Sequence, residues 1–159
     1  MKKLLLLVSV VAILTIIIIY VSSTTLNAYF VGVFPLSSFP SEGEIYSMPI
    51  TLKIRNKCPI LLTDIFAVES ISATPLPVSS YYYDHNKLFQ HGTTGVISIL
   101  EFNDCYSSHI LPAQGAWVKG NGGEELLLTL EPQNIWHPNW KVVIRYKVLG
   151  ILAKEVQVK

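Results

Sequence analysis

The chain has 159 residues, of which 50% are hydrophobic and 14% are charged. This size fits one folded unit plus a short anchor, and the composition is too apolar for a disordered protein. The 12 basic and 11 acidic residues give a net charge of +1. Because no basic block lies outside the termini, the sequence excludes the electrostatic footprint of a nucleic-acid-binding protein.

Residues 4–21 form an uncharged apolar run that only Ser9 and Thr15 interrupt. A helix of this length spans about 27 Å, close to the bilayer hydrocarbon thickness of about 30 Å. The summed insertion free energy is on the order of −5 kcal/mol. We therefore predict a transmembrane helix in which the two hydroxyls bond back to helix carbonyls.

The charges that flank this run predict its orientation. Lys2 and Lys3 precede it, and no charged residue follows before Glu42, so the positive-inside rule puts the N-terminus in the cytoplasm. We predict a cytoplasmic tip at residues 1–3, a transmembrane helix at 4–23 and an extracytoplasmic domain at 24–159. The alternative is a cleaved signal peptide, but secretory apolar regions usually run about 7–15 residues. The domain is exported in both cases.

Beyond the helix, short segments rich in Val, Ile, Leu, Tyr and Thr alternate with Pro, Gly, Asn and Ser clusters, which predicts strands and turns. The clearest strand shows a period of two, with Ile50, Leu52 and Ile54 on one face. Turns are expected at residues 121–123 and, as a bend or bulge, at Gly150. The strands are predicted at residues 26–34, 49–55, 61–68, 78–83, 96–102, 116–119, 126–130, 142–148 and 152–158.

This strand spacing, without a long amphipathic helix, predicts an all-β domain. We expect an antiparallel β-sandwich that is immunoglobulin-like in the broad sense. Cys58 and Cys105 are the only cysteines, and an even pair in an exported domain predicts a disulfide. Closing a loop of about 47 residues would stabilise the fold by about 4 kcal/mol on the chain-entropy model.

A copper site is an alternative use of one of these cysteines. Cys105, His109 and Gln114 resemble the C-terminal ligand loop of cupredoxins, and His85 resembles the upstream histidine of that family. A thiolate, imidazoles and a weak axial group suit copper electron transfer. Only about 20 residues separate His85 from Cys105, too few for the two intervening strands of a cupredoxin. Isolated surface histidines are the simpler interpretation, and we predict no cofactor.

Aromatic clusters are the strongest candidates for a protein interface. Tyr and Trp bury large areas at little entropic cost and keep a polar group. The alternative is that these rings close the ends of the core. The candidate interface residues are Tyr81, Tyr82, Tyr83, Trp136 and Trp140.

The sequence contains no nucleophile motif, phosphate loop or paired general acid and base. We therefore predict that the protein is not an enzyme.

Residues 50–62 contain a strand, Asn56, Pro59 and a second strand. This run resembles the strand-Asn-x-x-Pro-strand signature of water-stress-type (WHy) domains of late-embryogenesis-abundant proteins. It departs from the signature at the second Asn-Pro position, where Cys58 stands. The resemblance implies a seven-stranded sandwich, often membrane-anchored and without enzymatic activity. One short anchor plus a small exported sandwich is also similar in architecture to archaeal envelope proteins, including stator-type components of the archaellum.

These features together predict a non-catalytic accessory or structural subunit of a cell-envelope or membrane protein complex. Its predicted partners are the lipid bilayer and other envelope or membrane proteins, and the helix itself is a candidate contact surface. The alternatives are a membrane-tethered copper carrier and an adhesin or ligand-binding sandwich that uses the tyrosine and tryptophan clusters.

Overall fold

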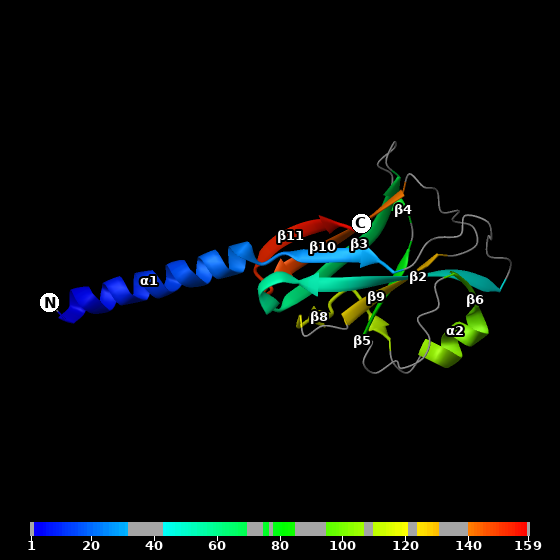
Figure 1. The fold of residues 1–159 in the computed structure, drawn as a ribbon, viewed down its shortest axis with the longest axis horizontal. Coiled ribbons are helices and arrows are strands. Elements are labelled where there is room, and N and C mark those ends of the chain that lie inside the picture. Colours follow the sequence, from blue (N-terminus) through cyan, green and yellow to red (C-terminus); the bar gives the residue numbers. More distant parts are fainter. Residues whose placement is uncertain are drawn as a thin grey trace.

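The structure is a computed structural model of the chain. It describes residues 2–31, 43–69, 75–76, 78–84, 95–106, 110–120, 124–130 and 140–158. An N-terminal helix projects from one end of a β-rich domain (Figure 1). We call this end of the domain the helix-proximal end and the opposite end the distal end.

Helix α1 (Lys2–Ser23) is apolar around its whole circumference, and the domain buries none of its side chains. It is long and apolar enough to cross a membrane. As predicted, the Ser9 hydroxyl donates to the carbonyl oxygen of Leu5 at 2.9 Å, and Thr15 donates to Val11 at 2.8 Å. The helix therefore satisfies its own polar groups, as a lipid environment requires.

The described residues beyond α1 form mainly antiparallel strands, which confirms the all-β prediction at this level. Only Thr24 and Thr25 separate α1 from the first strand. The elements are β1 (Leu26–Phe30), β2 (Glu44–Ile54), the short 3-10 helix η1 (Arg55–Lys57), β3 (Ile60–Glu69), β4 (Pro75–Leu76), β5 (Ser79–Asp84), β6 (Gly95–Ser98), α2 (Ile99–Tyr106), β7 (Leu111–Pro112), β8 (Trp117–Val118), β9 (Glu124–Leu130), β10 (Trp140–Val148) and β11 (Leu152–Gln157).

The strands form two sheets. The first has the order β1-β2-β9-β5-β7, and β6 also pairs with β2. The second has the order β11-β10-β3-β4, and β8 also pairs with β3. The chain passes from the first sheet to the second between β2 and β3, returns between β4 and β5, and enters the second sheet again at β8 and at β10. Residues 121–123 lie outside the described residues, but the strands on either side of them belong to different sheets and do not form a hairpin.

One apolar core lies between the two sheets. Its members alternate along the strands of both sheets, as the period of two in residues 49–55, 126–130 and 142–148 predicts. Burying each large aliphatic side chain contributes roughly 1.5–3 kcal/mol. The largest fully buried members are Leu26, Met48, Ile50, Leu52, Ile60, Leu62, Leu126, Leu128 and Ile144.

A second, smaller core lies between α2 and the outer face of the first sheet. Tyr83, Phe102 and Leu127 are buried there, and the rings of Tyr81 and Phe102 lie 5.7 Å apart. The prediction of one strand over residues 96–102 was wrong in its second half, because the chain becomes helical at Ile99. The hydroxyl of Ser98 caps this helix by accepting a hydrogen bond from the N–H of Glu101 at 3.1 Å.

A bulge interrupts β3 where it pairs with β10. Arg145 lies opposite Asp64, whereas Tyr146 lies opposite Leu62, so Thr63 is the extra residue. The buried positions therefore change phase, from Ile60 and Leu62 before the bulge to residues 65 and 67 after it. The bulge keeps apolar side chains in the core on both sides of the irregularity.

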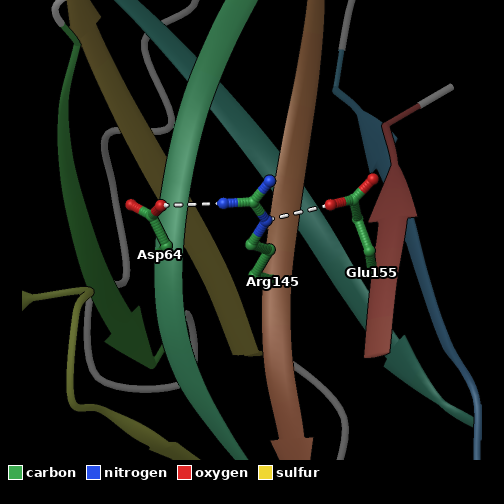
Figure 2. Close-up of polar contacts among 3 residues, drawn as sticks. All are labelled: Asp64, Arg145 and Glu155. Atoms are coloured by element: carbon green, nitrogen blue, oxygen red, sulfur yellow. Dashed lines mark hydrogen bonds and ion pairs between the residues drawn. The ribbon is translucent and has the colours of Figure 1, made fainter. Parts of the chain in front are cut away.

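A row of charged side chains crosses the outer face of the second sheet (Figure 2). The Arg145 guanidinium lies 3.7 Å from the Asp64 carboxylate and 2.9 Å from that of Glu155. It also lies over the Phe66 ring, 4.6 Å from the centroid. All three charged groups are about half exposed, so this row contributes little to stability.

Candidate functional site

The C-terminal end of α1 is closed by hydrogen bonds from the residues that follow it. The last carbonyls of a helix have no partner within the helix. Here the hydroxyls of Ser23 and Thr24 each donate to the carbonyl oxygen of Tyr20 at 3.0 Å. The N–H of Thr24 donates to Val21 at 3.3 Å. Thr24 is completely buried, so the chain enters the domain immediately after the helix.

Strand β11 also holds the helix end. The ammonium group of Lys154 donates to the carbonyl oxygens of Ser22 at 2.5 Å and Thr24 at 2.6 Å. A cation is favoured at this position because the C-terminus of a helix carries partial negative charge. Strand β10, which pairs with β11, contributes as well, since the hydroxyl of Tyr146 accepts a hydrogen bond from the N–H of Leu26 at 3.1 Å. The second sheet thus fixes the helix exit.

The segment after β2 provides a third contact. The Tyr20 hydroxyl donates to the carbonyl oxygen of Asn56, and the Asn56 amide donates to the Ser23 hydroxyl at 2.9 Å. Asn56 adopts a φ of 71°, in the left-handed region that asparagine tolerates better than most residues. The N–H of Arg55 donates to the carbonyl oxygen of Thr25 at 2.8 Å.

We call this set of contacts the junction, formed by Tyr20, Ser22, Ser23, Thr24, Asn56 and Lys154. The second sheet and the η1 connection between the sheets hold the end of α1, and Val21 packs against the core. With two residues between helix and strand, the junction leaves no linker that could act as a hinge. The direction of α1 is therefore fixed relative to the two sheets.

Exposed apolar side chains gather beside the junction, around the turn between β10 and β11. The fractional exposures are 82% for Ile151, 48% for Trp117 and 41% for Leu149. The Trp117 ring lies against the turn, because a Cβ built on Gly150 would meet its Cη2 atom at 3.4 Å. We call this surface the apolar tip, formed by Trp117, Leu149, Ile151 and Leu152. The β10–β11 turn lies beside the C-terminal end of α1 (Figure 1).

The predicted interface tyrosines lie in β5, where they contribute mainly to the two cores. Tyr83 is 2% exposed, and its hydroxyl donates to the carboxylate of Glu125. Tyr82 packs against the main core and Tyr81 against the smaller one. This is the core-closing alternative considered from the sequence. Trp136 and the side chain of Trp140 lie outside the described residues, although Trp140 begins β10.

The structure does not support the predicted disulfide. Cys58 is a free, buried cysteine that follows β2 at the helix-proximal end. Cys105 belongs to α2, which begins at the distal end, where the N–H of Ile99 donates to Gly43 at 2.9 Å. Between these ends β2 spans more than about 30 Å at its usual rise. A disulfide requires Cα atoms within about 7 Å, so the topology separates the two cysteines.

The candidate copper ligands fall mostly outside the described residues. His85, His109 and the side chain of Cys105 are among these, and Gln114 is exposed in the turn before β8. Among the described residues, no group of three or more His, Cys, Asp or Glu side chains is arranged to hold a metal ion.

The fold and the junction together define a two-sheet antiparallel β-domain rigidly joined to one N-terminal apolar helix. No protein-family model, curated protein or solved structure matches the chain.

Sequence reasoning did not identify the junction or the apolar tip. One signal for the junction was present in residues 152–158. Lys154 interrupts an alternating apolar row that otherwise contains Leu152, Val156 and Val158. A lysine on an inward-facing row needs an acceptor, and the carbonyls at a helix end are suitable ones. The signal for Asn56 was weaker, because an asparagine between two strands also fits an ordinary turn.

Proposed function

We propose that the protein is a single-pass membrane protein whose β-domain acts as a non-catalytic subunit of a cell-envelope or membrane protein complex. In this proposal α1 spans the bilayer with Lys2 and Lys3 in the cytoplasm, and the domain lies on the extracytoplasmic face. The bilayer and other membrane or envelope proteins are its partners.

The junction is the observation that carries this proposal. A domain that only needs to be kept near a membrane can be attached by a long flexible linker. Here two residues connect helix and strand, and side chains from η1 and from the second sheet hold the helix end. Such an attachment gives the domain one orientation relative to the bilayer. A fixed orientation benefits a subunit that must dock in a defined geometry.

The uncovered surface of α1 supports the same proposal. Apart from Val21, which packs against the core, the side chains of α1 before the junction are exposed, so that part of the helix is available to lipid or to neighbouring helices on its whole circumference. Association of helices in a membrane relies on packing and interhelical hydrogen bonds, because lipid tails are as apolar as leucine. We propose that one side of α1 packs against a larger membrane complex.

We further propose that the domain is an immunoglobulin-like sandwich of the water-stress type. Two antiparallel sheets around one core, and the passage of the chain from one sheet to the other between β2 and β3, support this class. The residues that carry the resemblance, Asn56 and Pro59, lie in that connection. Asn56 also takes part in the junction.

Co-purification tests the proposed function. The full-length chain with a C-terminal tag is expressed in its source cell, extracted in mild detergent and analysed by size-exclusion chromatography and mass spectrometry. We expect a complex with stoichiometric membrane partners. The matched control replaces residues 4–21 with an unrelated apolar helix, which keeps the anchor but changes its surface, and should lower the partner yield. A chain that elutes alone in both forms would contradict the proposal.

A further inference from the structure

The apolar tip exposes more hydrophobic surface than a solvated turn needs. Ile151 is 82% exposed at the end of the β10–β11 hairpin, with Leu149 and Leu152 on either side. A hairpin turn in water is normally built from polar residues and glycine. Only Gly150, with a φ of 73°, is a typical turn residue here. Isolated exposed apolar side chains are common, but a contiguous group of them marks an interaction surface.

The junction fixes where this tip lies relative to α1. Lys154 is two residues along β11 from Leu152 and binds the carbonyl of Ser22. On the adjoining side, the N–H of Leu149 donates to Pro59 at 3.0 Å, close to the Asn56 contact with Tyr20. The β10–β11 turn, which carries most of the tip, therefore lies level with the end of α1 (Figure 1). When α1 crosses a bilayer, this level is the boundary between headgroups and acyl chains.

The composition of the tip also fits that boundary. Trp117 is 48% exposed, and tryptophan is enriched at membrane interfaces, where its ring is buried and its N–H stays near water. Two basic residues lie at the same end of the domain as the tip, since Lys147 precedes the end of β10 and Arg55 follows the end of β2. Both are exposed. An apolar centre with basic neighbours is typical of surfaces that bind the membrane interface.

We propose that the apolar tip inserts into the extracytoplasmic leaflet and forms a second membrane contact beside α1. Trp117, Leu149 and Ile151 lie at the headgroup–acyl boundary, and the junction holds them there. The domain thus stands on the bilayer at two points, which fixes its tilt as well as its position. This inference rests on the proposed membrane-spanning role of α1.

Depth-dependent quenching of a single tryptophan tests this proposal. The full chain with W136F and W140F is reconstituted alone into nanodiscs, with lipids brominated near the headgroup end of the acyl chains. We expect these lipids to quench most of the Trp117 emission. The control carries L100W with all three native tryptophans replaced by Phe. It places its only tryptophan on α2, at the distal end, and should not be quenched.

Spin labelling provides a second measurement that leaves all the tryptophans in place. The chain with C105S and I151C is compared with C105S and L100C, because these two positions are similarly exposed, at 82% and 78%. Native Cys58 is buried and free and is not expected to react under folding conditions. Oxygen, which concentrates in lipid, should relax the label at position 151 more than a water-soluble nickel complex does. The order should reverse at position 100.

Alkaline washing of the same samples distinguishes the proposed membrane contact of the apolar tip from the proposed membrane-spanning role of α1, on which it rests. If the chain resists the wash but Trp117 is not quenched and position 151 favours nickel, the tip faces water or a protein partner. That result overturns the second membrane contact and leaves the spanning helix standing. If the wash removes the chain, the spanning helix is overturned and the membrane contact with it. Equal quenching at positions 117 and 100 also contradicts the proposal.

Discussion

Lys154 and Ser22 are 132 positions apart in the chain, yet the ammonium group of Lys154 donates to the carbonyl oxygen of Ser22 at 2.5 Å. This hydrogen bond joins the last turn of the N-terminal helix to the last strand of the domain. It satisfies a carbonyl that the helix leaves open and puts a positive charge at the negative end of the helix dipole. The hydrogen bond therefore ties the end of the helix directly to the second sheet.

Removal of the lysine charge should loosen the junction. K154M keeps the length and apolar stem of the side chain but loses both hydrogen bonds to the backbone. Hydrogen bonds to charged groups contribute about 1.5–3 kcal/mol, and Lys154 is half-buried, so we expect a loss of about 1–3 kcal/mol in unfolding free energy. Thermal unfolding in detergent measures it. K147M changes an exposed lysine nearby and should alter stability by less than about 0.5 kcal/mol.

The angle between helix and domain provides a more specific measurement of the same change. Spin labels at one position in α1 and one in β11 should give a narrow distance distribution in the native chain. The distribution should broaden in K154M. An equally narrow distribution in both proteins would show that Lys154 does not hold the helix in place.

Gly150 should resist substitution by alanine because of its backbone conformation. Its φ of 73° lies in the left-handed region, where an L side chain costs roughly 1 kcal/mol or more. A Cβ at this position would lie 3.4 Å from the Trp117 ring, an ordinary van der Waals contact, so the cost comes from the backbone conformation. We expect G150A to lower the unfolding free energy by about 1–2 kcal/mol. G150N should cost less, because asparagine tolerates this conformation. Chemical denaturation of both variants makes the comparison, and equal stabilities would contradict the argument.

The two sheets should unfold together because they share one core. Leu128 in the first sheet and Ile144 in the second are both completely buried in it. L128A and I144A should each cost about 2–5 kcal/mol and shift the same single transition. L100A, at a position 78% exposed, serves as the control and should shift it by less than about 0.5 kcal/mol. Two separate transitions in either core variant would contradict a shared core.

Tyr46 should make the domain sensitive to alkaline pH. Burial raises the pKa of the Tyr46 phenol above its ordinary value, because the charged phenolate is poorly solvated in the core. The unfolded chain then releases this proton at a lower pH than the folded protein. The contribution of the neutral Tyr46 phenol to the unfolding free energy is therefore complete below about pH 10, and it decreases as the pH rises above that value.

Y46F removes this titration and is the matched variant. The unfolding free energy of the native protein should fall more steeply above about pH 10 than that of Y46F, because only the native protein carries the buried phenol of Tyr46. The slopes are compared, because loss of the hydroxyl also changes stability at neutral pH. Parallel slopes would show that Tyr46 does not contribute to the alkaline loss of stability.

The elements with uninterrupted patterns could be predicted from the sequence. The apolar run at residues 4–21 predicted α1, and the period of two in residues 142–148 predicted β10 nearly to its ends. β3 was harder, because the bulge at Thr63 changes the phase of its buried positions halfway along. α2 was missed for a related reason. Among the α2 residues whose burial is described, only Phe102 is buried, while Ile99 and Leu100 are exposed, so the apolar residues do not follow a helical period.

The junction could not be predicted because its contacts join residues that are distant in the sequence. Asn56 bonds to Ser23 across 33 positions, and Lys154 reaches Thr24 across 130. Local patterns contain no information about such pairs until the strand order is known. The disulfide prediction used pairing statistics for exported proteins. It was not supported, because the topology places Cys58 and Cys105 at opposite ends of β2.

Protease protection in oriented membranes tests the central claim, that α1 spans the bilayer and holds the domain on its extracytoplasmic face, most directly. The full-length chain, with a tag on the domain, is compared in intact cells or right-side-out vesicles and in inside-out vesicles, all after alkaline washing. We expect the chain to remain in the membrane pellet. Protease added to right-side-out membranes should remove the domain, and inside-out membranes should protect it. Loss of the chain to the wash, or digestion of the domain from the cytoplasmic face only, would contradict the account.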